Sequence, residues 1–393
     1  LTTRRAFKAQ VLPPYPVDGY GRPLHSRPDM SPAVCGLPTS ALADEILHEG
    51  EGRIRALFTI GGNPMRAWPD PKRTERALRA LELHVAVEPR RTETARLAHY
   101  VLAPKLPLET PGCSLSTESL FTVSPALGYT DRYGQYAPPV ASPPPGSDLR
   151  EDWEFFFGLA QRMGLELELA AGVFPIPGVE TPRTKLDMRR KPGSEEVLEW
   201  TTRGAWIPLD RLRADPDRVL FDEEPAVFVE PGEADAAARL CVGSALLLDE
   251  LATFAAGEAY EREGFDYHLV SRRMANTFNS VGTDIPALTD RYGTNPAFMH
   301  PDDLIREGLA KGDRIRLASA HGEVEARVWP DPDLRRGLVS MTHCWGAGSD
   351  PTGSSGPHGA HVGELISVEV DCARFSGIPL MSALPVRVLR IGS

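Results

Sequence analysis

The chain has 393 residues, of which 41% are hydrophobic and 25% are charged, so it is long and apolar enough for two or three folded domains and is neither disordered nor fibrous. Its net charge of -11 at pH 7 argues against nucleic acid as a partner, because phosphate binding usually needs a basic face. No apolar stretch reaches the roughly 18 to 20 residues that span a membrane, so we expect a soluble chain without a transmembrane segment.

The cysteine pattern argues against a disulfide framework and against a cluster motif. The five cysteines are widely spaced, and none belongs to a Cys-x-x-Cys pair. Iron-sulfur and zinc motifs need closely spaced thiolates, so we expect reduced, mostly buried thiols instead. The sequence does not identify the compartment, and both a cytoplasmic and a periplasmic location in a prokaryote agree with it.

The first part of the chain predicts a βαβ unit that follows a connector. Residues 1–40 are rich in Pro and Gly and show little periodicity, which is typical of a connector. Leu42 to Leu47 carry apolar residues at helical spacing, and the stretch Leu57–Pro64 follows, in which an apolar β-type run breaks into Gly-Gly-Asn-Pro. Lys72 to Leu83 predict a helix, and a second apolar run begins at His84. This order favours two parallel strands joined by a helical crossover.

The turn after the first apolar run has the residues of a ligand-binding loop. Gly61 and Gly62 let a ligand approach the backbone, and Asn63 carries an amide for a phosphate or a base. Pro64 ends the loop. Glu88 follows the second run, where a carboxylate suits ribose hydroxyls or the amino edge of a guanine. Since Gly-Asn-Pro also makes ordinary strand-to-helix turns, spacing alone favours a nucleotide site and a plain turn equally.

The middle of the chain is less regular. Residues 133–148 are too rich in proline for a helix or a central strand, so we expect a surface loop. Trp153 to Met163 carry an apolar stripe that ends at Gly164, which predicts a packed helix. Residues 175–240 mix Pro, Gly and charge, and only irregular structure with short helices is expected there, without a readable function.

After Gly264 the pattern changes to short β-rich runs separated by Gly and Asp turns, which predict a compact β-barrel. We therefore expect an α/β nucleotide-binding domain over residues 1–262 and a β-barrel domain over residues 263–393. The predicted strands of the barrel are Tyr267–Ser271, Arg314–Ala318, Glu323–Trp329, Leu338–Thr342, Leu365–Val370 and Val386–Ile391.

Two sets of segments resemble one enzyme family. Phe58–Pro64, Thr92–Ala95 and Tyr100–Pro104 resemble the second nucleotide-binding region of molybdopterin oxidoreductases of the dimethyl sulfoxide reductase type. Asn295-Pro296, His300–Ser319, Gly322 and Arg335–Gly346 resemble the carboxyl-terminal pterin-binding barrel of the same family. The resemblance implies a Rossmann-like parallel-sheet domain followed by a double-psi β-barrel. It also implies molybdenum bis(molybdopterin guanine dinucleotide) as the cofactor, with two dinucleotides on one molybdenum.

The same resemblance implies individual cofactor contacts. Thr92, Glu93 and Thr94 are placed at the pyrophosphate or the pterin, although a helix cap with a first-turn carboxylate is the alternative for these residues. Arg272 and Arg273 follow a predicted strand, at the entry to a pterin-binding loop of the family. An arginine fork matches phosphate oxygens and pterin carbonyls, and a surface strand end is an equally good interpretation of Arg273. Further contacts are implied for Asn276, Thr277, Asp303, His343, Trp345, Gly346 and His361.

Three positions depart from the family pattern. His99 stands where the family commonly has Asp, so no role is carried onto it. His361 and Gly363 stand where many relatives have asparagines, which argues against the usual amide contacts of that segment.

A structural metal and a nucleophile are both disfavoured. His343, Cys344, His358 and His361 combine imidazole and thiol groups, but their spacing is irregular and includes no second Cys or carboxylate. Gly-x-Ser-x-Gly and Walker sequences are absent from the chain. We therefore expect no side-chain metal site and assign no catalytic residue.

The function implied by the resemblance is that of the carboxyl-terminal part of a molybdenum-dependent oxidoreductase. The chain begins at Leu1 without a methionine, and the family order places an iron-sulfur segment and the protein ligand to molybdenum before the matching part. We therefore expect the amino-terminal half of the same enzyme as a partner, with an electron-transfer iron-sulfur subunit as a further one. A cofactor-free scaffold with a degenerate site is the alternative, whereas a nicotinamide-dependent dehydrogenase is disfavoured because its Gly-x-Gly-x-x-Gly sequence is absent.

Overall fold

The structure is a computed structural model that describes residues 7–8, 24–28, 37–114, 133–171, 182–205, 207–215, 219–220, 229–230, 245–256, 263–289, 292–346, 359–373 and 377–391. The chain forms two compact units. The first contains residues 1–11 and 102–239, and the second contains residues 12–101 and 240–393. The second unit thus combines the predicted βαβ region with the predicted barrel. The sequence predicted instead two domains that follow one another along the chain, with a boundary near residue 262, and this boundary stays a prediction.

The second unit contains the predicted βαβ arrangement. Strands β2 (Ala56–Ile60) and β3 (Leu83–Val87) are parallel neighbours, and β4 (Tyr100–Leu102) completes a three-stranded sheet of order β2-β3-β4. The crossover between β2 and β3 contains helix α3 (Pro71–Ala80). The helix ends before the predicted Leu83, because that residue already pairs with Ala56 in the sheet.

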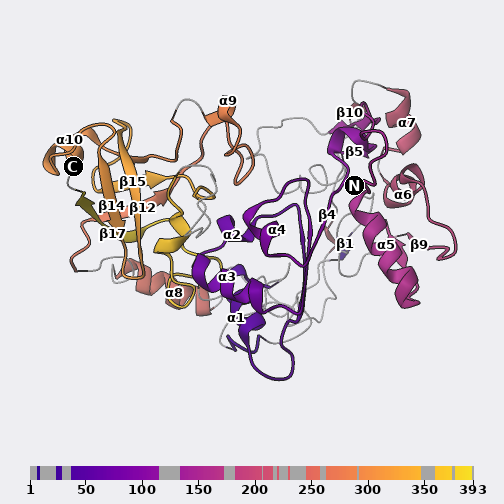
Figure 1. Ribbon diagram of the computed structural model, residues 1–393, viewed down its shortest axis with the longest axis horizontal. Coiled ribbons are helices and arrows are strands. Elements are labelled where there is room, and N and C mark those ends of the chain that lie inside the picture. The colour runs from indigo at the N-terminus through magenta and orange to yellow at the C-terminus, as the bar shows by residue number, and fades with distance from the viewer. Residues whose placement is uncertain are drawn as a thin grey trace. The chain divides into compact units, whose positions relative to one another are not determined.

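Short helices accompany this sheet and fix its loops (Figure 1). They are α1 (Thr39–Leu47), α2 (Pro64–Ala67), α3 and α4 (Glu93–Leu97). Asp70 caps α3 by accepting a hydrogen bond from the backbone N–H of Arg73 at 3.1 Å. Apolar side chains of α1, α2 and α3 share one buried cluster, so the loop after β2 begins from a packed base. The fully buried members are Ala43, Ile46, Met65, Ala77, Leu78 and Leu81.

The predicted barrel is present and closed (Figure 1). Its six strands run in the order β12-β16-β13-β15-β14-β17. The β12/β16 and β13/β15 pairs are parallel, and the remaining neighbours are antiparallel. Alternate residues of the strands point inward and fill the barrel, as Ile315 and Leu317 do on β14. The strands are β12 (Tyr267–Ser271), β13 (Ala297–Met299), β14 (Arg314–Ala318), β15 (Glu323–Pro330), β16 (Leu338–Met341) and β17 (Leu384–Arg390).

Five of the predicted barrel strands are confirmed, and the remaining one is wrong. The predicted strand Leu365–Val370 is not a strand: the chain there forms the 3-10 helix η4 (Val362–Leu365) and then turns. Leu365 and Ile366 are both fully buried, so burial does not alternate along this segment as it does in a half-buried strand. The sequence also failed to predict β13, because three consecutive buried residues carry no period.

Asp303 builds the barrel and does not reach a described cavity. It lies in helix α10 (Pro301–Arg306), is 0% exposed, and accepts a hydrogen bond from the backbone N–H of Gly337 at 2.7 Å. Its other carboxylate oxygen lies 3.3 Å from Arg306 and 3.7 Å from Arg336. The predicted cofactor contact of Asp303 is therefore not supported by its position. The Gly312-Asp313 turn is present, with the Asp313 carboxylate 2.9 Å from the backbone nitrogen of Ala310.

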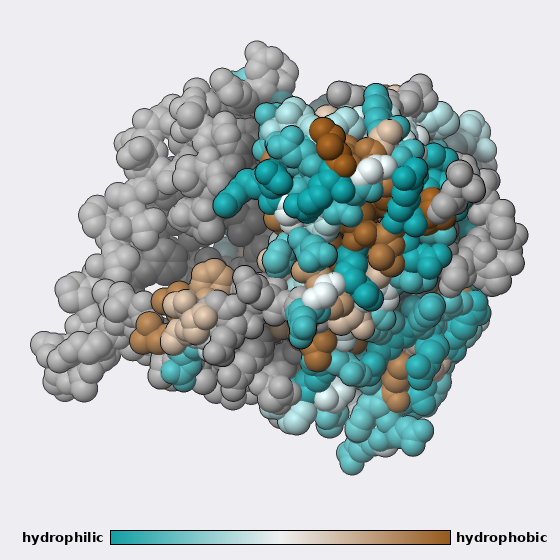
Figure 2. Space-filling view, turned by 90° about the vertical axis from the view of Figure 1, so that its left-hand side faces the viewer, coloured by the Kyte–Doolittle hydropathy of each residue, from teal (hydrophilic) through white to brown (hydrophobic). Residues whose placement is uncertain are grey.

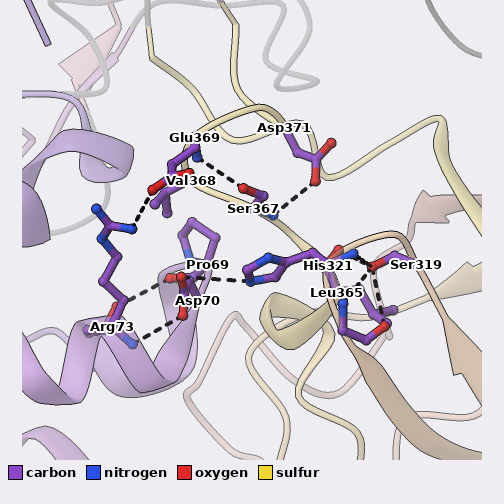
Figure 3. A network of polar contacts seen from close by, with 12 residues as sticks. Pro69, Asp70, Arg73, Ser319, His321, Leu365, Ser367, Val368, Glu369 and Asp371 are labelled. Atoms are coloured by element: carbon purple, nitrogen blue, oxygen red, sulfur yellow. Dashed lines mark hydrogen bonds and ion pairs between the residues drawn. The ribbon is translucent and has the colours of Figure 1, made fainter.

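A polar network joins helix α3 to the barrel, and Figure 3 shows its members at close range. Arg73 donates to the carboxylate of Glu369 at 2.8 Å. His321 extends from the barrel toward Asp70 and lies 3.7 Å from its carboxylate. The hydroxyl of Ser319 donates to the carbonyl of Leu365 at 2.7 Å, which ties η4 to the end of β14. These contacts connect segments that are far apart in the sequence.

Main-chain contacts complete this junction. The backbone N–H of Asp70 donates to the carbonyl of Gly363 at 2.9 Å. A Cβ atom on Gly363 would lie 2.8 Å from the carbonyl oxygen of Trp68 and 2.8 Å from the ring of His361, so a side chain has no room there. The ring of His361 in turn donates from Nε2 to the carbonyl of Met65 at 2.7 Å. The α2–α3 segment and the barrel therefore meet backbone to backbone.

The first unit is built from short elements. Its longest described helix, α5 (Asp152–Met163), ends before Gly164 as predicted. The proline-rich stretch 133–148 begins with two short strands, and its described remainder is largely exposed and irregular. Short elements also occur in the described part of 175–240. Besides α5, the described helices of this unit are η1 (Pro107–Glu109), α6 (Ser194–Thr201) and α7 (Leu209–Ala214). Its described strands form the pairs β5 (Gly112–Cys113) with β7 (Tyr136–Ala137), β6 (Tyr133–Gly134) with β10 (Val219–Leu220), β8 (Glu168–Ala170) with β9 (Arg183–Lys185), and β1 (Phe7–Lys8) with β11 (Val229–Glu230).

The described surface is mainly hydrophilic on the face that carries the barrel. Figure 2 shows hydrophobic residues there in small groups separated by hydrophilic ones. The second unit also contains helices α8 (Ala245–Ala255) and α9 (Pro286–Thr289). Within the described ranges, no helix is long and apolar enough to cross a membrane.

Candidate functional site

The loop after β2 opens onto a cavity of about 410 Å³. All of its walls belong to the second unit, and they come from three places: the loop and start of α2, the segment between β3 and α4, and the barrel loop of residues 280–285. We call this the β2 cavity. Its lining residues are Gly61, Gly62, Asn63, Arg66, Glu88, Pro89, Arg90, Arg91, Thr92, Glu93, Arg96, Ser280, Val281, Gly282, Asp284 and Ile285.

Gly61 turns the chain away from the sheet at the mouth of the β2 cavity. Its φ is +56°, and its N–H still donates to the carbonyl of Val87 at 3.0 Å, so the turn begins directly at the end of the strand pair. A side chain would be strained in this conformation although it would meet no atom within 4 Å. Pro64 starts α2, where its missing N–H costs nothing. The predicted backbone approach to a ligand is therefore sterically open.

Asn63 forms its hydrogen bonds within the protein itself. Its side chain is 6% exposed, its amide donates to Glu93 Oε2 at 2.8 Å, and its carbonyl oxygen accepts from the hydroxyl of Thr94 at 2.8 Å. Thr94 also accepts a hydrogen bond from the backbone N–H of Met65 at 3.0 Å. The amide that the sequence offered to a phosphate or a base is thus engaged within the protein, and a contact of Asn63 with a ligand stays a prediction. Asn63 locks the loop after β2 to the start of α4.

Arg66 was not predicted from the sequence, yet it is the central cation of the site. Its guanidinium binds Glu93 through Nη2 and donates from Nη1 to the hydroxyl of Thr283 at 2.8 Å. The side chains of Arg66 and Glu93 are only 7% and 10% exposed. Burial would raise the pKa of Glu93, but the hydrogen bond from Asn63 and the charge of Arg66 outweigh it and hold that pKa below its usual value. The carboxylate is thus ionised and joins α2, α4 and the barrel loop.

Charged residues surround the exposed end of the β2 cavity. Arg90 forms an ion pair with Asp284 of the barrel loop. Burial raises the pKa of Glu88, and a hydrogen bond and the charge from Arg90 oppose that rise. Thr92 caps α4 by accepting from the N–H of Ala95 at 3.2 Å, so the alternative expected for Thr92, a helix cap, is present in the structure. Whether Glu88, Thr92 and Glu93 touch a cofactor stays a prediction.

A second group of predicted site residues lies in the turn of residues 342–346, directly after β16. Asn295 holds this turn: its amide donates to the carbonyls of Thr342 at 2.8 Å and of Ala360 at 2.9 Å, and its oxygen accepts from the N–H of Ala360 at 2.8 Å. Gly346 packs against the backbone of His361. The sequence motif contained Asn295, but only the structure shows that it clamps the turn to the segment of His361.

Several polar atoms around this turn are buried and have no hydrogen-bond partner among the described residues. In a folded protein nearly all such atoms are satisfied, and each unsatisfied one costs about 1 to 3 kcal/mol. Several of them in one turn are what a ligand rich in donors and acceptors would satisfy. Four of them lie in the turn or on the segment clamped to it, namely Thr342 Oγ1, His343 Nδ1, Trp345 Nε1 and His361 Nδ1, whereas Arg66 Nε, Thr277 Oγ1 and His84 Nδ1 lie outside the turn.

The predicted loop after β12 lines a separate cavity of about 170 Å³. Arg272 is already bound there: it donates to Asp331 at 2.9 Å, and its guanidinium lies 3.8 Å from the centroid of the Phe298 ring. Arg273 is exposed and donates to Asn279. Asn276 and Thr277 also line this cavity. The structure thus favours a structural role for Arg272 and leaves Arg273 as the more accessible cation.

No side-chain metal centre is present in the described ranges, where no group of three or more His, Cys, Asp or Glu residues is placed to hold an ion. His358 lies outside the described residues. Burial raises the pKa of Cys344 to about 11, so its thiol is protonated at neutral pH and is a poor metal ligand. Burial, together with the charge of Arg273, lowers the pKa of His343, which is therefore neutral.

Residues 267–381 match the family described as "Molydopterin dinucleotide binding domain". This match covers most of the barrel and includes the 342–346 turn and His361.

Similar proteins match a larger part of the chain. The alpha subunit of a formate dehydrogenase from Methanocaldococcus jannaschii is 24% identical over 77% of this chain and 41% of its own length. Trimethylamine-N-oxide reductase from Haemophilus influenzae is 23% identical over 80% of this chain and 40% of its own length. Biotin sulfoxide reductase from Cereibacter sphaeroides is 23% identical over 86% of this chain and 46% of its own length. The chain thus spans less than half the length of these relatives.

The fold is also found in a solved structure. Acetylene hydratase from Pelobacter acetylenicus superposes with a TM-score of 0.66, at 16% identity, over 91% of this chain and 47% of that protein. At this identity the likeness concerns the fold.

Proposed function

Because the chain belongs to the molybdopterin oxidoreductases of the dimethyl sulfoxide reductase type, we propose that it is the dinucleotide-binding, carboxyl-terminal part of a molybdenum-dependent oxidoreductase. It supplies two cradles, one for a guanosine diphosphate moiety in the β2 cavity and one for pterin groups around the 342–346 turn. The observation that carries this proposal is the group of unpartnered polar atoms buried around that turn.

The described residues fit such a cofactor chemically. A pterin ring presents several N–H donors and ring acceptors in one plane, and the unpartnered atoms of Thr342, His343 and Trp345 offer both kinds of partner. His361 donates from Nε2 to Met65, and burial lowers the pKa of its ring, so the neutral ring leaves Nδ1 as an acceptor. The arginines of the β2 cavity suit a pyrophosphate. A Rossmann-like sheet and a double-psi barrel are part of the proposal, and the parallel pairs β2/β3, β12/β16 and β13/β15 support them.

The chain contributes binding and orientation. When bound, the molybdenum centre supplies two-electron redox chemistry, and the protein sets its surroundings. Glu88 accepts hydrogen bonds from ribose hydroxyls or from the guanine N–H groups, as its position at the end of β3 allows. Asn63, Arg66 and Glu93 keep the loop after β2 in the shape that receives the nucleotide.

The substrate and the partners follow from relatives only as proposals. The relatives include proteins named for formate, trimethylamine N-oxide and biotin sulfoxide, so we propose a two-electron redox reaction on a small molecule without choosing among these classes. Since the formate dehydrogenase relative is named as an alpha subunit, we also propose an electron-transfer subunit as a partner, together with the amino-terminal part of the same enzyme.

Metal and nucleotide analysis tests the proposal. The full-length protein is expressed in a host that synthesises the cofactor, and molybdenum is quantified together with the GMP that acid releases. We expect one molybdenum and two GMP per polypeptide. A protein that folds, retains its thermal unfolding transition and yields neither molybdenum nor GMP would overturn the proposal in favour of a cofactor-free scaffold.

A further inference from the structure

The ion pair between Arg90 and Asp284 crosses the exposed end of the β2 cavity. Arg90 follows β3, whereas Asp284 belongs to the barrel loop of residues 280–285, and both side chains line the cavity. The guanidinium and the carboxylate are both substantially exposed, at 54% and 45%. Exposed pairs of this kind contribute only about 0.2 to 1 kcal/mol. Another charged group can therefore replace either partner at little cost.

Asp284 is not needed to hold its loop in place. Thr283, the preceding residue, is buried, and it accepts a hydrogen bond from Arg66 at 2.8 Å and donates one to the carbonyl of Ser280 at 3.1 Å. Because this anchor lies beneath the surface, the Asp284 side chain can leave Arg90 by a rotamer change while the loop backbone stays where it is. The two contacts of the loop thus have different characters, one buried and permanent, the other exposed and exchangeable.

The charges of the cavity make Arg90 a natural anion partner. Arg66 is already neutralised by the buried carboxylate of Glu93. Arg91 is exposed and has no ion-pair partner among the described residues. Arg90 adjoins it in sequence and forms its ion pair with Asp284, while the half-buried carboxylate of Glu88 also interacts with the charge of Arg90. A pyrophosphate has more negative charge than one carboxylate and suits a cavity that both arginines line.

We propose that Asp284 is an internal counter-ion that occupies Arg90 in the empty site and is displaced by the pyrophosphate of the incoming nucleotide. The proposal rests on the proposed function, since it takes the β2 cavity as the nucleoside diphosphate site. Without the nucleotide the carboxylate neutralises Arg90, and with the nucleotide bound the phosphates do so. Nucleotide binding therefore competes with an intramolecular anion, and Asp284 sets the affinity for the phosphates without contacting the base.

Calorimetric titration of the cofactor-free, full-length protein with GDP tests this proposal. Asp284→Asn should bind GDP about two- to fivefold more tightly than the unmodified protein at low salt, because no ion pair has to be broken. The gain should shrink as the salt concentration rises. Guanosine, which has no phosphate, should bind both proteins equally. Glu325→Gln is the matched control, because it removes the exposed partner of Arg314 on the same barrel, outside the cavity.

An Arg90→Ala background separates displacement from simple repulsion between Asp284 and the phosphates. If Asp284 acts through Arg90, Asp284→Asn has no further effect on GDP binding once Arg90 is absent. Equal GDP affinity of the unmodified and Asp284→Asn proteins overturns the inference and leaves the proposed function intact. A gain that persists in the Arg90→Ala background, or that appears with guanosine, overturns the inference as well. Absence of GDP binding by every variant overturns the proposed function itself.

Discussion

Replacement of Glu93 by glutamine should destabilise the protein through the cation that it leaves behind. The side chain of Glu93 is 10% exposed and that of Arg66 is 7% exposed, and the two form an ion pair. Removing one partner of a buried pair leaves an uncompensated charge in a low-dielectric region, which costs about 3 to 5 kcal/mol. Since glutamine keeps an oxygen that accepts from Asn63 or Arg66, we expect Glu93→Gln to lie at the lower end, near 3 kcal/mol. Such a loss is a large share of a typical folding free energy of about 5 to 15 kcal/mol.

Urea unfolding of the cofactor-free protein measures this effect. At pH 7 the transition midpoint should fall without a change in the m value, since the compactness of the folded protein is unaffected. The double variant Arg66→Met/Glu93→Gln should be more stable than Glu93→Gln alone, because it also removes the unpaired cation. A loss below about 0.5 kcal/mol in Glu93→Gln, or additive effects in the cycle, would refute the assignment of a buried, coupled pair.

The pH dependence of the same pair has a definite sign. The folded pKa of Glu93 lies below its ordinary value of 4.5, so its stabilising contribution is complete above pH 4.5 and is lost as the pH falls through the folded pKa. The unmodified protein should therefore lose stability below pH 4.5 faster than Glu93→Gln, which lacks this carboxylate. Parallel stability curves for the two proteins between pH 6 and pH 3 would contradict the lowered pKa.

Two further predictions concern the junction and the nucleotide. Gly363→Ala should lower stability in thermal unfolding by about 1 to 3 kcal/mol, because its methyl group meets the carbonyl of Trp68 at 2.8 Å. Gly112→Ala is the matched control, because a Cβ there meets no atom within 4 Å, and an equal loss in both variants would refute the clash. Glu88→Gln should weaken GDP binding by about tenfold to a hundredfold, because it removes a charged hydrogen-bond acceptor from the cavity wall. The unfolding midpoint of the cofactor-free protein should stay unchanged, since Glu88 is only half-buried. Unaltered GDP binding, or a collapse of the apoprotein, would assign Glu88 a structural role.

Local patterns in the sequence predicted most of the elements that build the site. The two short apolar runs became β2 and β3, the predicted helix after Lys72 is α3, and β-rich runs separated by Gly and Asp turns predicted five strands of the barrel. These signals are readable because burial repeats with the period of the backbone over a few neighbouring residues. The Gly-Asn-Pro loop and Glu88 were predicted together for the same reason, since parallel strands place their carboxyl ends at one edge.

The partners within the site were decided by the tertiary structure. Arg66 binds Thr283, which is 217 residues away, and Arg90 binds Asp284, which is 194 residues away, and no local period marks either pair. Asn63 looked like a free ligand amide, yet burial against Glu93 and Thr94 turned it into an internal brace. Gly363 looked like a lost asparagine, but the close approach of Trp68 leaves space for a hydrogen atom only. The sequence determines which residues favour burial. The partner of a buried charge or hydrogen-bonding group depends on how distant segments pack, because only the groups that the fold brings near it can satisfy it.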